Sequence, residues 1–351
     1  MSFVFCNQRS GKGSLVIVVS AVLAAQGVST PVGAAEPLTV YAYRQMAVMT
    51  PLLDQFTRET GVAISVVSGQ PDVLLGRLVA EGPNSPADVL LTIDVTNLEA
   101  ARIAGVLRPL QSLELNARVP AWLRDRNGYW VAQSLWPRAI LTAVGEPART
   151  WSYSDLADPA QKGRVCVRSS SDIYSASFME SAVANLGKTG ASRWAEAVIA
   201  NLAAAPFKTG KALVNALEAG SCRIALDNAF YIGRMRRDPN ASTAAAARTI
   251  GVIWPTGWTS RPSGAVFAVS GAALAKNSPH PNAGRKLIEF LARPDIQLRY
   301  TDQTSEFPAL SAPTLPPSFA SMPLPQFDRT SLRNKSRTRE ADSIYHASGW
   351  N

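Results

Sequence analysis

Histidine is almost absent from this sequence, with only His280 and His346 among 351 residues. A Ser-His-Asp hydrolase needs a histidine base beside its nucleophile. His280 lies in a Ser-Pro-His-Pro turn and His346 in the last predicted helix, so neither falls in a segment expected to line a cleft. The chain also lacks any Lys/Arg run longer than a pair, which argues against nucleic-acid binding despite a formal net charge of +9. Gly187-Lys188-Thr189 lacks the earlier glycine of a phosphate-binding loop. These absences favour a binding protein over an enzyme.

Residues 1–35 have the pattern of a secretory signal peptide. Arg9 and Lys12 give a basic start, residues 15–25 are almost entirely apolar, and small residues at 32–35 suit cleavage before Glu36. The apolar run is short for a membrane span, and no cysteine lies at the junction to carry a lipid anchor. The sequence therefore predicts export to the periplasm, and removal of Arg9 and Lys12 lowers the net charge from +9 to +7.

Cysteine is also scarce. Cys6 lies within the predicted signal peptide, so Cys166 and Cys222 are the pair left in the mature chain. An even number of cysteines in an oxidising compartment favours a disulfide between them. Two buried free thiols are the alternative.

Strands and helices are predicted to alternate after residue 36, which is typical of an α/β fold with parallel-rich sheets flanked by helices. Strands are predicted at residues 38–42, 62–67, 88–93, 163–167, 222–226, 250–254 and 265–269. Helices are predicted at residues 51–60 (with Thr50 as the cap and Pro51 first), 71–80, 97–104, 176–186, 191–202, 211–219, 282–300 and 332–346. Two such units joined by crossing strands give two lobes with a cleft between them, residues 36–135 plus 260–310 and residues 136–259 plus 311–351.

Ligands of parallel α/β sheets bind beyond the carboxyl ends of the strands. The segments that follow the predicted strands are residues 41–46, 94–97, 168–174 and 227–234. These segments are therefore expected to line the cleft. Asp227 is a carboxylate at a strand end without an assigned role, and Arg234, Arg236 and Arg237 are interpreted as a solvated helix face or a surface for a membrane partner.

Several blocks of the sequence resemble the ferric-iron-binding proteins of ABC importers. They are residues 81–94 (EGPNSPADVLLTID), 165–171 (VCVRSSS), 157–159 with 162–163, 228–234 (NAFYIGR) and the closing Gly349-Trp350. The resemblance implies a periplasmic-binding-protein fold whose lobes close on a hinge. It also implies a monomer that delivers its solute to an ABC permease and its ATPase.

The resemblance implies that Tyr174 and Tyr231 are the metal ligands. Members of this family hold Fe(III) mainly through tyrosines, often with a histidine and an anion, and a phenolate suits this hard cation. The sequence departs from the pattern where Phe230 replaces the first tyrosine of a pair, and where Gln45 and Met46 replace a His-Tyr pair. Tyr43 lies next to this gap and is a candidate ligand contact, with a tyrosine on the sheet surface as the alternative.

An anion site is also implied. Arg138 and Arg44 match family positions, Arg138 one that helps to hold the anion, with a surface charge as the alternative. Ser169, Ser170 and Ser171 precede a helix start, where free N–H groups and hydroxyls bind anions, or serve only as caps and turns.

The main hypothesis is thus a binding protein for Fe(III), either free with a synergistic anion or chelated. Because several expected ligands are missing, the alternative is a small phosphorylated or carboxylated organic anion. Phe230 and Trp136 would then be walls of the cleft. A sensor domain that signals to a membrane partner without transport is a third hypothesis.

Overall fold

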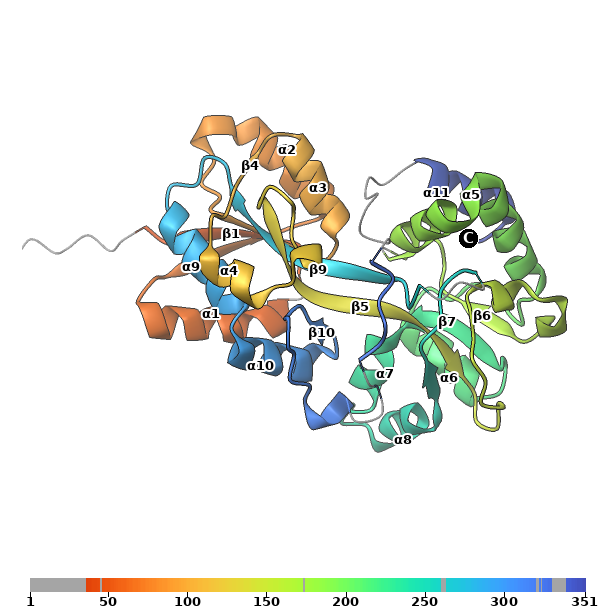
Figure 1. The fold of residues 1–351 in the computed structure, drawn as a ribbon. Helices are drawn as coiled ribbons and strands as arrows, with labels where there is room; N and C mark the ends of the chain where they lie inside the picture. The colour runs from red at the N-terminus through yellow and green to blue at the C-terminus, as the bar shows by residue number, and fades with distance from the viewer. Residues whose placement is uncertain are drawn as a thin grey trace, which may run out of the picture. The chain divides into compact units, whose positions relative to one another are not determined.

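The computed structural model describes residues 36–44, 46–172, 174–259, 263–319, 322, 324–329 and 339–351. The predicted signal peptide and the candidate ligand residue Gln45 lie outside these ranges. Within the described part of the chain, no helix is long and apolar enough to cross a membrane. The described residues from Glu36 onward form the predicted two-lobed α/β fold, in which helices flank a central sheet (Figure 1).

Lobe 1 is built around parallel strands and the helices that connect them. β1 (Leu38–Ala42) pairs in parallel with β2 (Ile64–Ser68) and with β3 (Val89–Thr92). The helices of this region are α1 (Met46–Thr60), α2 (Pro71–Glu81), α3 (Val95–Ile103) and α4 (Leu113–Arg118). Figure 1 shows α2 and α3 on one side of the strands and α1 on the other. The carboxyl ends of β1 and β3 therefore bring Tyr43 and Asp94 to the same edge of the sheet.

β5 (Trp130–Thr142) and β9 (Phe267–Ala275) run side by side between the lobes (Figure 1). Residues 130–137 of β5 pair with β9, and residues 138–142 pair with β7 (Ile224–Asn228). β9 also pairs with β3, and the short strands β4 (Leu107–Arg108), β8 (Gly251–Ile253) and β10 (Phe307–Pro308) add to these long strands. The crossing strands are antiparallel to their neighbours, and β5 changes its partner from β9 to β7 after residue 137.

Lobe 2 repeats the α/β arrangement. β6 (Val165–Val167) pairs in parallel with β7. Its helices are α5 (Ser175–Ala200), α6 (Gly210–Glu218), α7 (Ala229–Met235), α8 (Ala241–Thr249) and the C-terminal α11 (Arg339–Ser348). α11 packs on α5, where the Tyr345 hydroxyl donates a hydrogen bond to the Ser175 carbonyl over 2.8 Å. This contact holds the C-terminal helix against the start of α5.

The predicted start of the first helix is wrong, because α1 begins at Met46 and Pro51 lies inside it. Met49 is buried on the same stripe as Leu52, Leu53 and Phe56. Burial of this stripe extends the helix upstream of the proline, at the cost of the hydrogen bond that Pro51 cannot donate.

The predicted helix 282–300 is also wrong, because it is divided into α9 (Pro281–Leu291) and α10 (Pro294–Thr304). The residue before a proline avoids helical geometry, and Arg293 has φ −67° and ψ 141°. The predicted helices 176–186 and 191–202, by contrast, are confirmed as two helical segments of α5, because Gly187 has the non-helical angles φ 71° and ψ 163° and interrupts the helix between them.

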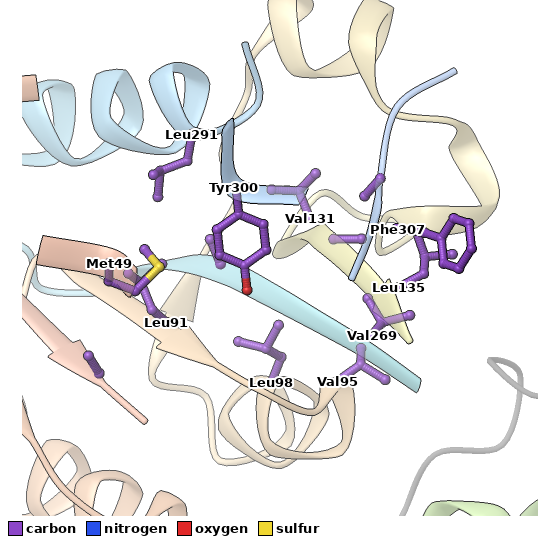
Figure 2. Close-up of a cluster of buried hydrophobic side chains, with 14 of the residues drawn as sticks. Met49, Leu91, Val95, Leu98, Val131, Leu135, Val269, Leu291, Tyr300 and Phe307 are labelled. Atoms are coloured by element: carbon purple, nitrogen blue, oxygen red, sulfur yellow. The ribbon is translucent and has the colours of Figure 1, made fainter. Parts of the chain in front are cut away.

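The core of lobe 1 determines the position of Tyr300, which α10 carries. Figure 2 shows this ring among apolar side chains that include Met49, Leu91 and Leu98. Its hydroxyl donates a hydrogen bond to the Glu306 carboxylate over 2.8 Å, so core packing holds the ring and this bond holds the hydroxyl. The packing therefore presents a buried aromatic ring to the cleft described below.

Candidate metal and anion site

A pocket of about 370 Å³ lies where the segments from both lobes meet. Its lining, among the described residues, consists of Tyr43, Arg44, Val48, Met49, Ile93, Tyr174, Tyr231, Arg234, Tyr300, Thr304 and Glu306. Phenols and guanidinium groups thus face one space, although the corresponding residues are far apart in the sequence.

A second pocket of about 680 Å³ shares Tyr43, Ile93 and Tyr174 with the first. Its charged lining residues, within the described part of the chain, are all acidic: Asp72, Asp94, Asp172, Glu180 and Asp342. The cleft therefore has an arginine-containing part and an acidic part, with Tyr43 and Tyr174 between them. Asp94 also caps α3, because its side chain accepts a hydrogen bond from the Thr96 N–H over 2.9 Å.

Tyr174 occupies the turn that precedes α5. Arg138 on β5 donates to its carbonyl oxygen, and its ring packs edge-on against Trp136 with 4.2 Å between ring centroids. Phe230 contacts the same ring at 5.8 Å. Burial raises the pKa of the Tyr174 phenol, and the nearby Tyr231 and Glu306 raise it further. The phenol is thus protonated at neutral pH.

Tyr231 lies on α7 and is held by close contacts. The central guanidinium carbon of Arg168 is 5.2 Å from its ring centroid. On α6, a Cβ atom added to Gly210 would lie 2.7 Å from the ring atoms Cγ and Cδ2 of Tyr231, closer than any real Cβ contact. Burial raises the pKa of the Tyr231 phenol, and the positive charge of Arg168 opposes this rise.

Arg168 is the centre of a buried polar cluster beneath Tyr231. Its guanidinium lies 3.2 Å from a carboxylate oxygen of Asp172 and 3.6 Å from one of Asp227. It also donates to the backbone carbonyl of Lys208 over 3.1 Å. Burial raises the pKa of Asp227 to about 7, although the charge of Arg168 favours its ionised form. The cluster fixes the loop before Tyr174 to the strand before Tyr231.

Glu306 contacts both arginines of the first pocket and also the crossing strand β5. Its carboxylate lies 3.6 Å from Arg44 and 3.4 Å from Arg234, and it accepts hydrogen bonds from Ser134 and Tyr300. Burial lowers the pKa of the Arg44 guanidinium, and the charge of Glu306 opposes this effect. One carboxylate facing two arginines leaves a positive excess, which suits an anionic group in the pocket.

The other predicted anion residues are placed differently. Ser170 and Ser171 line the second pocket, whereas the Ser169 hydroxyl is bonded to that of Ser171 over 2.9 Å. Arg138 lines neither pocket and is occupied by the Tyr174 carbonyl.

Phe230 is buried and also lines neither pocket. The Phe230 ring packs against Tyr231 with 4.3 Å between ring centroids. The central guanidinium carbon of Arg234 lies over the Phe230 ring, 4.6 Å from its centroid. Trp136 is buried in the same aromatic cluster. The rings of Trp136 and Phe230 therefore pack against the tyrosines without lining the pocket themselves.

The sequence alone assigns no binding role to Arg168, Arg234, Tyr300 and Glu306, although Arg168 and Arg234 lie in segments expected to line the cleft. Arg234 was interpreted as part of a solvated face, yet it lines the first pocket. Glu306 could have been suspected, because it is a lone carboxylate directly before the apolar pair Phe307-Pro308. Tyr300 was hidden in a helix whose apolar stripe gave no hint that its hydroxyl end faces a pocket.

The disulfide expected between Cys166 and Cys222 is present. It joins β6 to the segment that enters β7, so it ties together the two strands that lead to Tyr174 and Tyr231.

Among the described residues, no group of three or more His, Cys, Asp or Glu side chains could hold a metal ion. The phenols that line the first pocket are those of Tyr43, Tyr174, Tyr231 and Tyr300. Phenolate oxygens are anionic and hard, which matches trivalent iron better than softer metals.

The model of the bacterial extracellular solute-binding protein family matches residues 43–298, which is more than half of the chain. This chain belongs to that family. Iron uptake protein A1 of Synechocystis sp. is 33% identical to it over 350 residues, covering 97% of this chain and 96% of that protein.

Solved structures of solute-binding proteins have the same fold. A Trichodesmium protein (IdiA, FutA), solved in complex with iron and citrate ligands, has a TM-score of 0.81 and 29% identity. The similarity covers 90% of this chain and 100% of that one. A Bordetella ferric binding protein has a TM-score of 0.81 and 31% identity, with the same coverage.

Proposed function

We propose that this solute-binding protein serves an ABC importer and that its solute is ferric iron, bound with a synergistic anion or as a chelate. The observation that carries the proposal is that Tyr174 and Tyr231 line one pocket with the arginines Arg44 and Arg234. Phenolates suit Fe(III), and guanidinium groups suit the carboxylate or other anion that completes its coordination. The relatives and structures named as iron-binding proteins support the same solute.

In this proposal Tyr174 and Tyr231 are the phenolate ligands. Burial raises the pKa of both phenols, so the ion must displace a proton from each. A trivalent cation drives this proton loss far better than a divalent cation, because its charge stabilises the phenolate more strongly. The raised pKa therefore favours Fe(III) over the divalent metals that compete for oxygen ligands.

The remaining coordination positions are assigned to an anion or to the donor atoms of a chelate. The first pocket, of about 370 Å³, is much larger than one ion. Arg44 and Arg234 face this space, and Ser170 and Ser171 extend the polar surface into the second pocket. Tyr43 contacts the ligand from lobe 1, while Arg138 and Ser169 keep the loop before Tyr174 in position.

We infer a transport cycle that the fold and the family membership support. Residues 1–35 direct export to the periplasm, where the mature protein acts as a monomer. Contacts from Tyr43 and Arg44 on lobe 1 and from Tyr174 and Tyr231 on lobe 2 favour the closed arrangement of the lobes when the ligand is bound. The loaded protein then delivers iron to a permease that its ATPase drives.

A spectroscopic titration tests the solute. The mature chain, stripped of metal, is titrated with ferric citrate while its visible spectrum and iron content are recorded. We expect one iron per chain and a tyrosinate-to-iron charge-transfer band. Tyr174→Phe and Tyr231→Phe should each weaken the band and lower the affinity about tenfold to a hundredfold.

Tyr129→Phe is the matched control, because Tyr129 is a half-buried tyrosine of lobe 1 that lines neither pocket of the cleft. It should leave the band unchanged. If the wild-type chain takes up no iron and shows no band, iron is not the solute. A thermal-shift screen of small carboxylates and phosphates then tests the organic-anion alternative.

A further inference from the structure

Asp172 lies in the loop between β6 and α5, two residues before Tyr174, and lines the second pocket of the cleft. Its backbone is fixed, because its N–H donates to the Ser169 carbonyl over 3.0 Å and its carbonyl accepts from the Ser175 N–H over 2.8 Å. The side chain is 5% exposed. The carboxylate is therefore held in a defined place at the edge of the site.

The two carboxylate oxygens of Asp172 have different surroundings. Oδ1 faces the Arg168 guanidinium at 3.2 Å. Oδ2 is buried and has no hydrogen-bond partner among the described residues. Burying an anionic oxygen without a donor or a cation is unfavourable. The Oδ2 atom of Asp227 also lacks a partner among the described residues, but of the two residues only Asp172 lines a pocket of the cleft, where a bound group would satisfy its oxygen.

The charge of Asp172 acts on the phenols from both lobes. Burial is the main cause that raises the pKa of Tyr43, Tyr174 and Tyr231, and the negative charge of Asp172 adds to the rise in each case. Asp172 is the charged group common to the main causes for all three phenols. The carboxylate of Asp172 is therefore close enough to Tyr43, Tyr174 and Tyr231 for its charge to act on all three phenols.

Asp227 provides an internal comparison. It also pairs with Arg168, at 3.6 Å, but it is completely buried and lines neither pocket of the cleft. One carboxylate beside Arg168 thus faces the protein interior, and the other borders the space where the solute is proposed to bind.

We propose that Asp172 is a ligand of the bound ferric ion, contributing a carboxylate oxygen beside the phenolates of Tyr174 and Tyr231. This inference rests on the proposed function. A carboxylate is a hard anionic donor of the kind that Fe(III) prefers. It supplies negative charge that the side chains at Phe230, Gln45 and Met46 do not provide. The Arg168 ion pair orients the carboxylate and leaves its second oxygen for the metal.

Three variants test this ligand by the same ferric citrate titration, each with its thermal unfolding midpoint measured. Asp172→Asn removes the charge at nearly constant volume and should lower the iron affinity about tenfold or more. It should also move the charge-transfer band to longer wavelength, because iron that loses an anionic donor accepts an electron more readily. Asp172→Glu retains the carboxylate and should keep the wild-type band position.

Asp227→Asn is the matched comparison, because it removes the other carboxylate beside Arg168. With a pKa raised to about 7, Asp227 is partly protonated near neutral pH, so asparagine resembles a form that the fold already accommodates. The band position should not move in this variant. If Asp172→Asn and Asp227→Asn change the affinity equally and neither moves the band, Asp172 serves only as a partner of Arg168.

A second measurement applies even if Asp172→Asn does not fold. Infrared difference spectra of the wild-type chain with isotope-labelled aspartate, taken before and after iron loading, should contain a shifted carboxylate stretch. The absence of any aspartate signal on loading would overturn the inference. A wild-type chain that binds no iron would instead refute the proposed function itself.

Discussion

The guanidinium of Arg168 lies over the ring of Tyr231, with 5.2 Å between its central carbon and the ring centroid. Because the same guanidinium is paired with Asp172 and Asp227, the position of a proposed ligand phenol depends on a buried ion cluster in the strands beneath it. The α6 backbone at Gly210 approaches the same ring. Tyr231 thus has little freedom to move, which favours a preorganised metal site.

Gly210→Ala should weaken iron binding without unfolding the protein. Its backbone is not in the left-handed region, so alanine is conformationally permitted, but its Cβ would lie 2.7 Å from Cγ of Tyr231 and displace the ring. We expect an iron affinity lower by about tenfold. The measurement is the ferric citrate titration, with thermal unfolding to verify the fold.

Gly76→Ala is the control for this substitution, because Gly76 is an exposed helical glycine with nothing within 4 Å of an added Cβ. It should raise the stability by about 0.5–1 kcal/mol and leave iron binding unchanged. Equal iron affinities for the two glycine variants would contradict the role given to Gly210.

Phe230→Tyr should increase iron binding. The substitution restores a phenol at a position where the sequence departs from the ferric-binding pattern, beside Tyr231 at a ring separation of 4.3 Å. A third phenolate should intensify the charge-transfer band and raise the affinity about tenfold. Without iron, the buried hydroxyl should cost about 1–3 kcal/mol of stability if it lacks a partner. A band no stronger than that of the wild type would show that this position does not reach the metal.

The disulfide between Cys166 and Cys222 should stabilise the fold without contributing to the site. The cysteines are 56 residues apart and line neither pocket of the cleft. The double variant Cys166→Ala, Cys222→Ala should therefore lose about 2–5 kcal/mol of unfolding free energy, measured by denaturant titration. Its iron affinity at low temperature should equal that of the wild type, and a large loss there would show that the disulfide also positions the tyrosines.

Much of the fold follows from local sequence patterns. The apolar run at β3 and the capped or Gly-terminated helices α2, α3 and α6 are close to their predicted positions, because the burial pattern and the local geometry agree. At Pro51 the burial pattern and the local geometry disagree, and the helix α1 continues through the proline because its apolar stripe is buried. At Pro294 the outcome is the opposite, and a new helix begins at the proline. The long strand β5 was missed, because all of its residues are buried and its pattern shows no alternation.

The site was only partly predictable. Tyr174 and Tyr231 follow predicted strands, and the resemblance identified both. Tyr300 and Glu306 belong to the segment that returns to the hinge after α10, so only the tertiary fold brings them to the same pocket. The sequence likewise could not distinguish Asp172 from Asp227, because only the tertiary fold shows that Asp172 lines the second pocket and that Asp227 lines neither pocket of the cleft.

Iron binding should release protons, and its affinity should rise with pH. Burial raises the pKa of Tyr174 and Tyr231, so both phenols are protonated at neutral pH and each loses a proton when it binds iron. Falling pH returns these protons in competition with the metal, and one released proton corresponds to about a tenfold loss of affinity per pH unit. Calorimetric titrations with ferric citrate in buffers of different ionisation enthalpy measure the number released. Tyr174→Phe should release about one proton fewer per iron than the wild type, and Tyr129→Phe the same number as the wild type. Because the citrate contribution is common to all three proteins, an unchanged proton count in Tyr174→Phe would mean that this phenol is not a ligand.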